Sequence, residues 1–147
     1  MNQYNWGIIG AGNIAGNFAE DLKLLPQARL KAISSRSTER ASEFAWKYNI
    51  PYWHDSWDAM AADPGIDIVY VATHHPFHFQ NTCACLEAGK AVICEKPIAM
   101  NRRELEIMVR IAREKKVFLM EAIWTRFLPS TRKVLEVGKS GELGRLT

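Results

Sequence analysis

The sequence predicts an α/β fold in which a doubly wound, mostly parallel sheet of six strands carries helices on both faces. Three observations support this prediction. Apolar runs of strand length alternate with stretches of helical period along the chain. The first of these runs leads directly into a glycine-rich turn. Polar motifs follow several predicted strands, which is where an open parallel sheet binds its ligands.

The apolar runs define the strands. We expect the first to end at residues 7–9 and the others to cover residues 28–34, 51–53, 66–73, 91–94 and 117–122. The run at 66–73 is the most apolar segment of the chain. Such a run is typical of a strand buried on both faces, so we expect it to lie centrally in the sheet.

Helices are expected over residues 14–25, 37–48, 57–62, 78–89, 101–116 and 130–137. Ser37, Ser56 and Asn101 are of the types that cap helix N-termini, and Asn101 with Glu104 resembles a capping box. The buried face of the helix over 101–116 is expected to consist of Leu105, Met108, Val109 and Ala112. Three aromatic residues are interpreted as packing residues, namely Tyr52, Trp53 and Trp57.

A G-x-G-x-x-A turn, Gly10 to Ala15, joins the first strand to the first helix. Gly10 can adopt backbone angles that a Cβ atom forbids, and Gly12 leaves room for a pyrophosphate against the main chain. The unpaired amides at the start of the helix favour an anion. This arrangement is typical of a Rossmann-type fold that binds a dinucleotide, with a glycine-rich turn that binds nothing as the alternative.

The end of the second strand indicates which dinucleotide is bound. An acidic residue usually holds the ribose 2′-hydroxyl of NAD here, but residues 34–38 read Ser-Ser-Arg-Ser-Thr. Arg36 can pair with the 2′-phosphate of NADP, Ser35 can add a hydrogen bond, and Arg40 follows one turn into the next helix. We therefore expect NADP rather than NAD, with a solvated Arg36 as the alternative.

A polar loop follows the predicted central strand and consists of Thr73, His74, His75, Pro76, Phe77 and His78. No carboxylate or thiol set with ligand spacing accompanies the histidines, so we expect no metal site. We expect the loop to bracket the ribose and nicotinamide of the cofactor, with His78 opening the next helix. Polar loop or helix-capping histidines are the alternative.

Glu95-Lys96-Pro97 stands at the carboxyl end of the fifth strand, facing the same crevice as the glycine turn. There the Lys96 ammonium can stabilise alkoxide character on a substrate oxygen during hydride transfer, and Glu95 can position the lysine or the ribose. An exposed ion pair is the alternative. Trp124 and Arg126 follow the sixth strand and are candidates for the crevice edge, with packing as the alternative for Trp124.

Composition narrows the class of protein. The chain has 147 residues, 48% of them hydrophobic and 24% charged, as expected for one soluble α/β domain. Its net charge of +3 comes from scattered basic residues, so we expect no nucleic-acid partner. No apolar run reaches the length of a membrane span. Three cysteines in apolar surroundings favour a reduced, cytoplasmic protein.

Four segments together resemble one family: GAGNIA at 10–15, SRS at 35–37, LEAGKAVICEKP at 86–97 and FLMEAIWTRFLP at 118–129. They are similar to the glucose–fructose oxidoreductase and inositol dehydrogenase (Gfo/Idh/MocA) family. The last segment resembles its branch of dimeric dihydrodiol dehydrogenase and NADP-dependent D-xylose dehydrogenase. The resemblance implies an NADP-binding domain of an oxidoreductase that transfers hydride between a nicotinamide cofactor and a sugar or vicinal diol.

The resemblance also assigns residues and boundaries. It implies a catalytic Lys96, and it matches the family's cofactor contacts to Gly10, Gly12, Asn13, Ile14, Arg36, Trp124 and Arg126. Residues 1–123 are expected to form the dinucleotide-binding domain. Residues 124–147 are expected to form a crevice segment, a helix and the start of a missing substrate and dimerisation domain, so that the full-length protein is a homo-oligomer. A non-catalytic NADP sensor or partner module is the alternative function.

Overall fold

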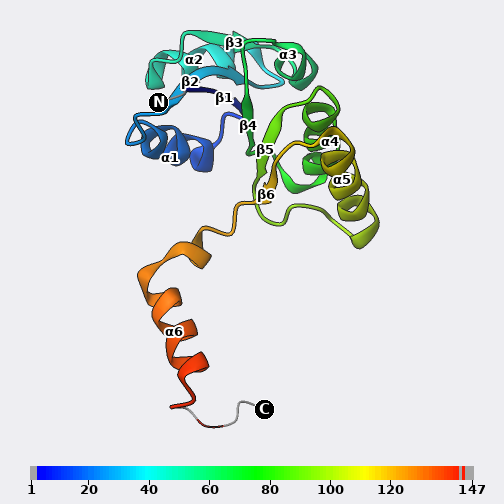
Figure 1. Ribbon diagram of the computed structural model, residues 1–147. Helices are drawn as coiled ribbons and strands as arrows, with labels where there is room; N and C mark the ends of the chain where they lie inside the picture. The colour runs from blue at the N-terminus through cyan, green and yellow to red at the C-terminus, as the bar shows by residue number, and fades with distance from the viewer. Residues whose placement is uncertain (1–2, 143, 145–147) are drawn as a thin grey trace.

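The structure, a computed structural model, describes residues 3–142 and 144. Within these residues, six strands form one sheet, as predicted. All of its strand pairs are parallel, and the strand order is β3-β2-β1-β4-β5-β6 (Figure 1). The strands are β1 (Tyr4–Ile9), β2 (Ala28–Ser34), β3 (Tyr52–His54), β4 (Ile68–Val71), β5 (Ala91–Cys94) and β6 (Leu119–Glu121). The chain reverses its direction of winding between β1 and β4, which opens a crevice at their carboxyl ends.

Helices cover both faces of the sheet. They are α1 (Asn13–Leu22), α2 (Thr38–Tyr48), α3 (Trp57–Ala62), α4 (His78–Glu87) and α5 (Arg102–Lys115), whereas α6 (Pro129–Ser140) lies apart from the sheet (Figure 1). On one face, α1 and α2 pack against Ile8, Ile33 and Tyr70. On the other, α3, α4 and α5 pack against alternate residues of the same strands, among them Ile9 and Val69. No helix in the described part of the chain is long and apolar enough to cross a membrane.

Three helices begin at the predicted capping residues. In each, the capping oxygen accepts a hydrogen bond from the amide three residues further on, at 3.2 Å for Ser37, 3.2 Å for Ser56 and 3.0 Å for Asn101. The Glu104 carboxylate in turn accepts from Asn101 Nδ2 at 3.0 Å and from the backbone amide of Met100 at 3.0 Å. The caps satisfy amides that would otherwise lack a partner, and they set where these helices start.

The predicted extent of the first helix and the predicted face of the helix over 101–116 differ from the observed ones. α1 ends at Leu22, so Leu25 lies beyond it and is exposed, as is Ile14. The residues of α1 that face the sheet are mainly small, Ala15, Gly16 and Ala19, because the helix lies close to the strands. In α5, Leu105 is exposed and Ile111 is buried in its place, since the helix turns the side bearing Met108, Ile111 and Ala112 toward the sheet.

The prediction that Tyr52 and Trp53 are packing residues is wrong. Their exposed fractions are 56% and 50%. The reason is the sheet order, because β3 is an edge strand that pairs only with β2. An edge strand covered on few sides leaves large side chains in solvent.

Beyond β6 the chain leaves the sheet. The short helix η2 (Trp124–Phe127) and then α6 extend away from the α/β body in Figure 1. No residue of α6, all of which the structure describes, is buried. We expected residues 124–147 to form a crevice segment, a helix and the start of a further domain. Residues 138–140 are helical, and those from 143 onward, apart from Gly144, lie outside the described residues.

β1 and β4 end so close together that a side chain does not fit between them at Gly10. This residue has a φ of +108°, and a Cβ atom there would lie 2.6 Å from the carbonyl oxygen of Ala72. The amide of Gly10 also donates to the carbonyl oxygen of Ser34 at 2.8 Å, which ties the turn to β2. Gly10 is therefore required both by its backbone angles and by the space available.

We predict that Gly10→Ala lowers the free energy of unfolding by about 1–3 kcal/mol, because it combines a left-handed φ with a backbone clash. Urea denaturation followed by tryptophan fluorescence measures the change. Gly12→Ala is the matched control, since a Cβ at Gly12 would meet nothing within 4 Å. Equal stability of the Gly10→Ala variant and the wild type would contradict the assigned constraint.

Candidate functional site

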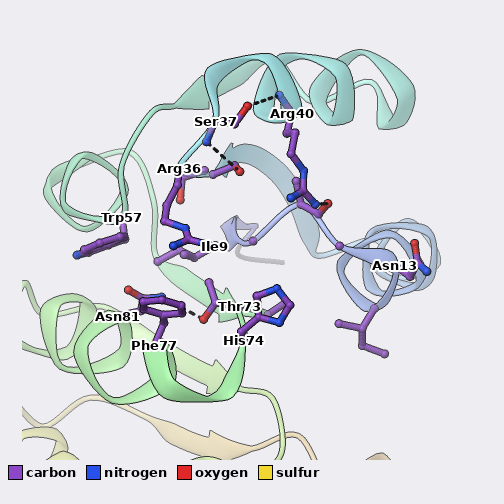
Figure 2. A pocket seen from close by; sticks show the side chains of 17 residues that line it. Ile9, Asn13, Arg36, Ser37, Arg40, Trp57, Thr73, His74, Phe77 and Asn81 are labelled. Carbon is purple, nitrogen blue, oxygen red and sulfur yellow. Dashed lines mark hydrogen bonds between the residues drawn. The ribbon is translucent and has the colours of Figure 1, made fainter.

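A cavity of about 530 Å³ lies at the carboxyl edge of the sheet, where β1, β2 and β4 end (Figure 2). Three segments form its walls: the glycine turn with the start of α1, the β2–α2 connection with Trp57 of α3 beside it, and the β4–α4 connection. Its lining residues are Ile9, Gly10, Ala11, Gly12, Asn13, Ile14, Ser34, Ser35, Arg36, Ser37, Arg40, Trp57, Ala72, Thr73, His74, Phe77 and Asn81. Nine of these were predicted as cofactor contacts: Gly10, Gly12, Asn13, Ile14, Ser35, Arg36, Arg40, Thr73 and His74.

The glycine turn presents main chain to the cavity. Gly12 is the N-cap of α1, with extended backbone and no capping side chain. The first turn of α1 carries no acidic residue, and Asn13 and Ile14 lie on the cavity wall. The positive end of the helix dipole and its unpaired amides therefore point toward a space that an anion can occupy.

Two arginines reach the cavity from the β2–α2 side (Figure 2). The Arg36 guanidinium lies 4.7 Å from the centre of the Phe77 ring, across the cavity. Arg40 Nη2 donates to the carbonyl oxygen of Ala11 at 3.2 Å, which links α2 to the glycine turn. Ser35 Oγ accepts from the amide of Ser37 at 3.4 Å. This wall is basic and rich in donors, so it suits a phosphate.

Acidic side chains do not face this wall. Glu39 lies in the first turn of α2, but its carboxylate accepts from Ser37 Oγ at 2.7 Å and does not line the cavity. The hydrogen bond from Ser37 lowers the pKa of the Glu39 carboxyl. Among the described residues that line the cavity, none is Asp or Glu. A second phosphate group would therefore meet positive charge without a carboxylate opposing it.

The loop after β4 contributes only part of its length to the cavity. Thr73 and His74 line it, whereas His75 and Pro76 are exposed and lie outside it. Over residues 3–142 and 144, no three side chains of His, Cys, Asp or Glu lie together as a possible metal site. Two histidines of the loop, His75 and His78, nevertheless pack edge to face, with their ring centroids 5.5 Å apart.

His78 lies away from the crevice position that we expected. It is fully buried at the start of α4, with Nδ1 2.8 Å from the carbonyl oxygen of Pro97 and Nε2 2.9 Å from that of Thr73. A neutral ring donates to one of these oxygens and a protonated ring to both. His78 thus fastens the end of β4 to the turn that carries Lys96, and it does not line the cavity.

Glu95 and Lys96 follow β5, at the same edge of the sheet as the cavity but outside its lining. The Glu95 carboxylate is buried and accepts hydrogen bonds from Tyr70 Oη and from the amide of Lys96. Burial, together with the hydrogen bond to the Glu95 carboxylate and its charge, raises the pKa of Tyr70 well above its ordinary range. The side chain of Lys96 is exposed. Buried hydrogen bonds thus fix the backbone of this turn, and the Lys96 ammonium remains accessible.

Trp124 and Arg126 do not join the cavity. Both lie in η2, where the chain departs from the sheet, and both are exposed. Their position follows from the course of the chain after β6, which runs outward rather than across the crevice (Figure 1).

Sequence reasoning missed four wall residues of chemical interest. Trp57, interpreted as packing, lines the cavity, and so do Ser34, Phe77 and Asn81. Phe77 and Asn81 are four residues apart at the start of α4, so helical spacing after the central strand could have found them. Ser34, the last residue of β2, carried no comparable signal.

Comparisons with known proteins agree with this geometry. Residues 4–123 match the profile of the GFO/IDH/MocA oxidoreductase family, which has an NAD-binding Rossmann fold. The chain is 46% identical over 143 residues to trans-1,2-dihydrobenzene-1,2-diol dehydrogenase of Mus musculus, covering 96% of this chain and 43% of that protein. The chain thus spans less than half the length of this curated relative.

Two solved structures share the fold. A probable dehydrogenase from Thermotoga maritima has a TM-score of 0.88 and 30% identity, covering 95% of this chain and 42% of that one. KijD10, a 3-ketoreductase from Actinomadura kijaniata solved with NADP and TDP-benzene, has a TM-score of 0.89 and 29% identity, covering 95% and 43% of the two chains.

The buried Tyr70 predicts a specific loss of stability in alkali. Because its pKa is raised in the folded state, the unfolded chain releases the Tyr70 proton first, and the contribution of Tyr70 to the free energy of unfolding falls by about 1.4 kcal/mol for each pH unit above about pH 10. We expect Tyr70→Phe to lower stability by about 1–3 kcal/mol at pH 8 and to reduce this alkaline loss.

Urea denaturation between pH 8 and pH 11 measures both effects. Tyr52→Phe serves as the control, since Tyr52 is largely exposed on the edge strand and its hydroxyl should contribute little. If the Tyr70→Phe and wild-type curves ran parallel in alkali, the assigned role of the Tyr70 hydroxyl would be wrong.

Proposed function

Because the chain belongs to the GFO/IDH/MocA oxidoreductase family, we propose that its cavity binds NADP and that it serves as the cofactor domain of a dehydrogenase acting on a sugar or vicinal diol. The observation that carries this proposal is the cavity itself. An anion-binding glycine turn and two arginines line one space that contains no acidic residue among the described lining residues. A dinucleotide with an additional 2′-phosphate carries negative charge at two places, which match the glycine turn and the two arginines.

The residues divide between two phosphate groups. The main chain of Gly10, Gly12, Asn13 and Ile14 would hold the pyrophosphate at the start of α1. Arg36, Arg40 and Ser35 would hold the 2′-phosphate. The lack of Asp and Glu among the described lining residues supports NADP over NAD, because a carboxylate facing the ribose would repel the 2′-phosphate.

The chemical step would take place at the Lys96 end of the crevice. The bound nicotinamide accepts or supplies the hydride. The Lys96 ammonium would donate a hydrogen bond to the substrate oxygen and stabilise its alkoxide form. That form arises when a carbonyl carbon gains hydride, or when a hydroxyl group releases its proton to solvent before its carbon loses hydride. His74, His75, Pro76, Glu95, Trp124 and Arg126 remain candidate contacts around the nicotinamide and substrate. Glu95 and His78 hold the turn of Lys96.

The same proposal extends to the architecture of the whole protein. Residues 1–123 would form the nucleotide domain, and residues 124–147 would lead into a substrate and dimerisation domain that makes the protein a homo-oligomer. The support is the greater length of the relative and the outward course of α6. A cytoplasmic location is supported by three free, buried cysteines, Cys83, Cys85 and Cys94.

The nucleotide preference is tested by titrating the chain with NADPH and NADH and following the fluorescence of its five tryptophans. We expect NADPH to bind at least about ten-fold more tightly, or about 1.4 kcal/mol. Arg36→Asp should abolish this preference by placing a negative charge beside the 2′-phosphate. Arg132→Asp, the same charge change in exposed α6, is the control. An NADPH preference that survives Arg36→Asp would disprove the assigned contact.

The catalytic proposal is tested in the full-length protein by Lys96→Ala. We expect turnover to fall by about a hundred-fold or more while NADPH affinity changes little, because the ammonium acts on the substrate oxygen rather than on the cofactor. Lys115→Ala, an exposed lysine at the end of α5, is the control. Wild-type turnover in the Lys96→Ala variant would disprove the catalytic role of Lys96 and leave only the proposal that the chain binds NADP.

A further inference from the structure

Three buried side-chain atoms lack a hydrogen-bond partner in the described part of the chain: Ser34 Oγ, Asn81 Oδ1 and Thr82 Oγ1. A buried polar atom without a partner costs free energy, so such atoms mark places where a partner is supplied from outside the protein. Ser34 and Asn81 both line the cavity, although they come from opposite walls. The hydroxyl of Thr82 lies instead against the Cys94 thiol and away from the cavity.

Asn81 is held so that its carbonyl oxygen is the free group. Its side-chain nitrogen Nδ2 donates to Thr73 Oγ1 at 3.1 Å, which leaves Oδ1 as an acceptor without a donor. Figure 2 shows Asn81 beside Thr73, Phe77 and Trp57. The vacant acceptor therefore belongs to a side chain that lines the cavity together with the aromatic side chains of Trp57 and Phe77.

We infer that Asn81 reads the nucleobase of the bound nucleotide, its Oδ1 accepting a hydrogen bond from the exocyclic amino group of adenine. This inference rests on the proposed function. A phosphate offers no donor to a carbonyl oxygen, so Asn81 does not suit that part of the ligand. The flat faces of Trp57 and Phe77 suit a planar base, and an amide oxygen at its edge discriminates bases that carry an amino group.

The position of Arg36 adds a step to base binding. If a base stacked between the Arg36 guanidinium and the Phe77 ring, these two groups would have to lie roughly 7 Å apart, which is twice the usual contact distance. The observed distance from the guanidinium carbon to the ring centre is 4.7 Å. Arg36 must therefore move off Phe77 before the base reaches Asn81. The same movement frees its guanidinium for the 2′-phosphate.

The test compares NADPH with reduced nicotinamide hypoxanthine dinucleotide phosphate, in which a carbonyl oxygen replaces the adenine amino group. We expect the wild-type chain to bind NADPH at least about ten-fold more tightly, because the analogue sets an acceptor against the Asn81 acceptor. Asn81→Ala should weaken NADPH binding by about ten-fold and bring the two affinities within about three-fold of each other.

Two further variants keep the test decisive. Asn81→Asp retains an acceptor, so it should preserve the preference for NADPH even if both affinities fall. Thr82→Val removes a similarly buried hydroxyl that faces away from the cavity and should change neither affinity. Equal wild-type affinity for both nucleotides would overturn the role of Asn81 and leave the proposed function standing. Failure of the folded chain to bind either nucleotide would overturn both.

Discussion

The close approach of Gly10 to the carbonyl oxygen of Ala72 is the constraint on which the site depends. It lets β1 and β4 end side by side, with no side chain between them, at the point where the winding of the sheet reverses. From that point α1 departs with its N-terminus toward the crevice, and α4 departs on the other face. The cavity is the space that these diverging elements leave between them.

A second set of interactions holds the reactive end of the crevice. Tyr70 and the buried Glu95 support the turn after β5 from the sheet, and His78 reaches the same turn from α4. These groups are buried, whereas Lys96 is exposed between them. Buried hydrogen bonds from two elements fix the backbone of Lys96, and this limits the positions that its flexible side chain can reach.

The sequence was informative wherever local rules decide the structure. β2 and the capped starts of α2, α3 and α5 follow from residue type and periodicity, and the glycine turn with Arg36 follows from a motif. The missed features depend on tertiary structure. Exposure of Tyr52 follows from the edge position of β3, and the wall position of Asn81 follows from how α4 sits on the sheet. The roles of Lys96, Trp124 and Arg126 stay predictions.

The walls of the cavity come from segments that are separate in the sequence, near residues 9–14, 34–40, 57 and 72–81. A molecule that contacts all of them acts as a noncovalent cross-link between the two halves of the sheet. Its binding energy then enters the folding equilibrium, adding about 2.7 kcal/mol when its concentration is a hundred times Kd. A bound nucleotide would thereby stabilise the folded chain and slow the proteolysis that acts on its unfolded form.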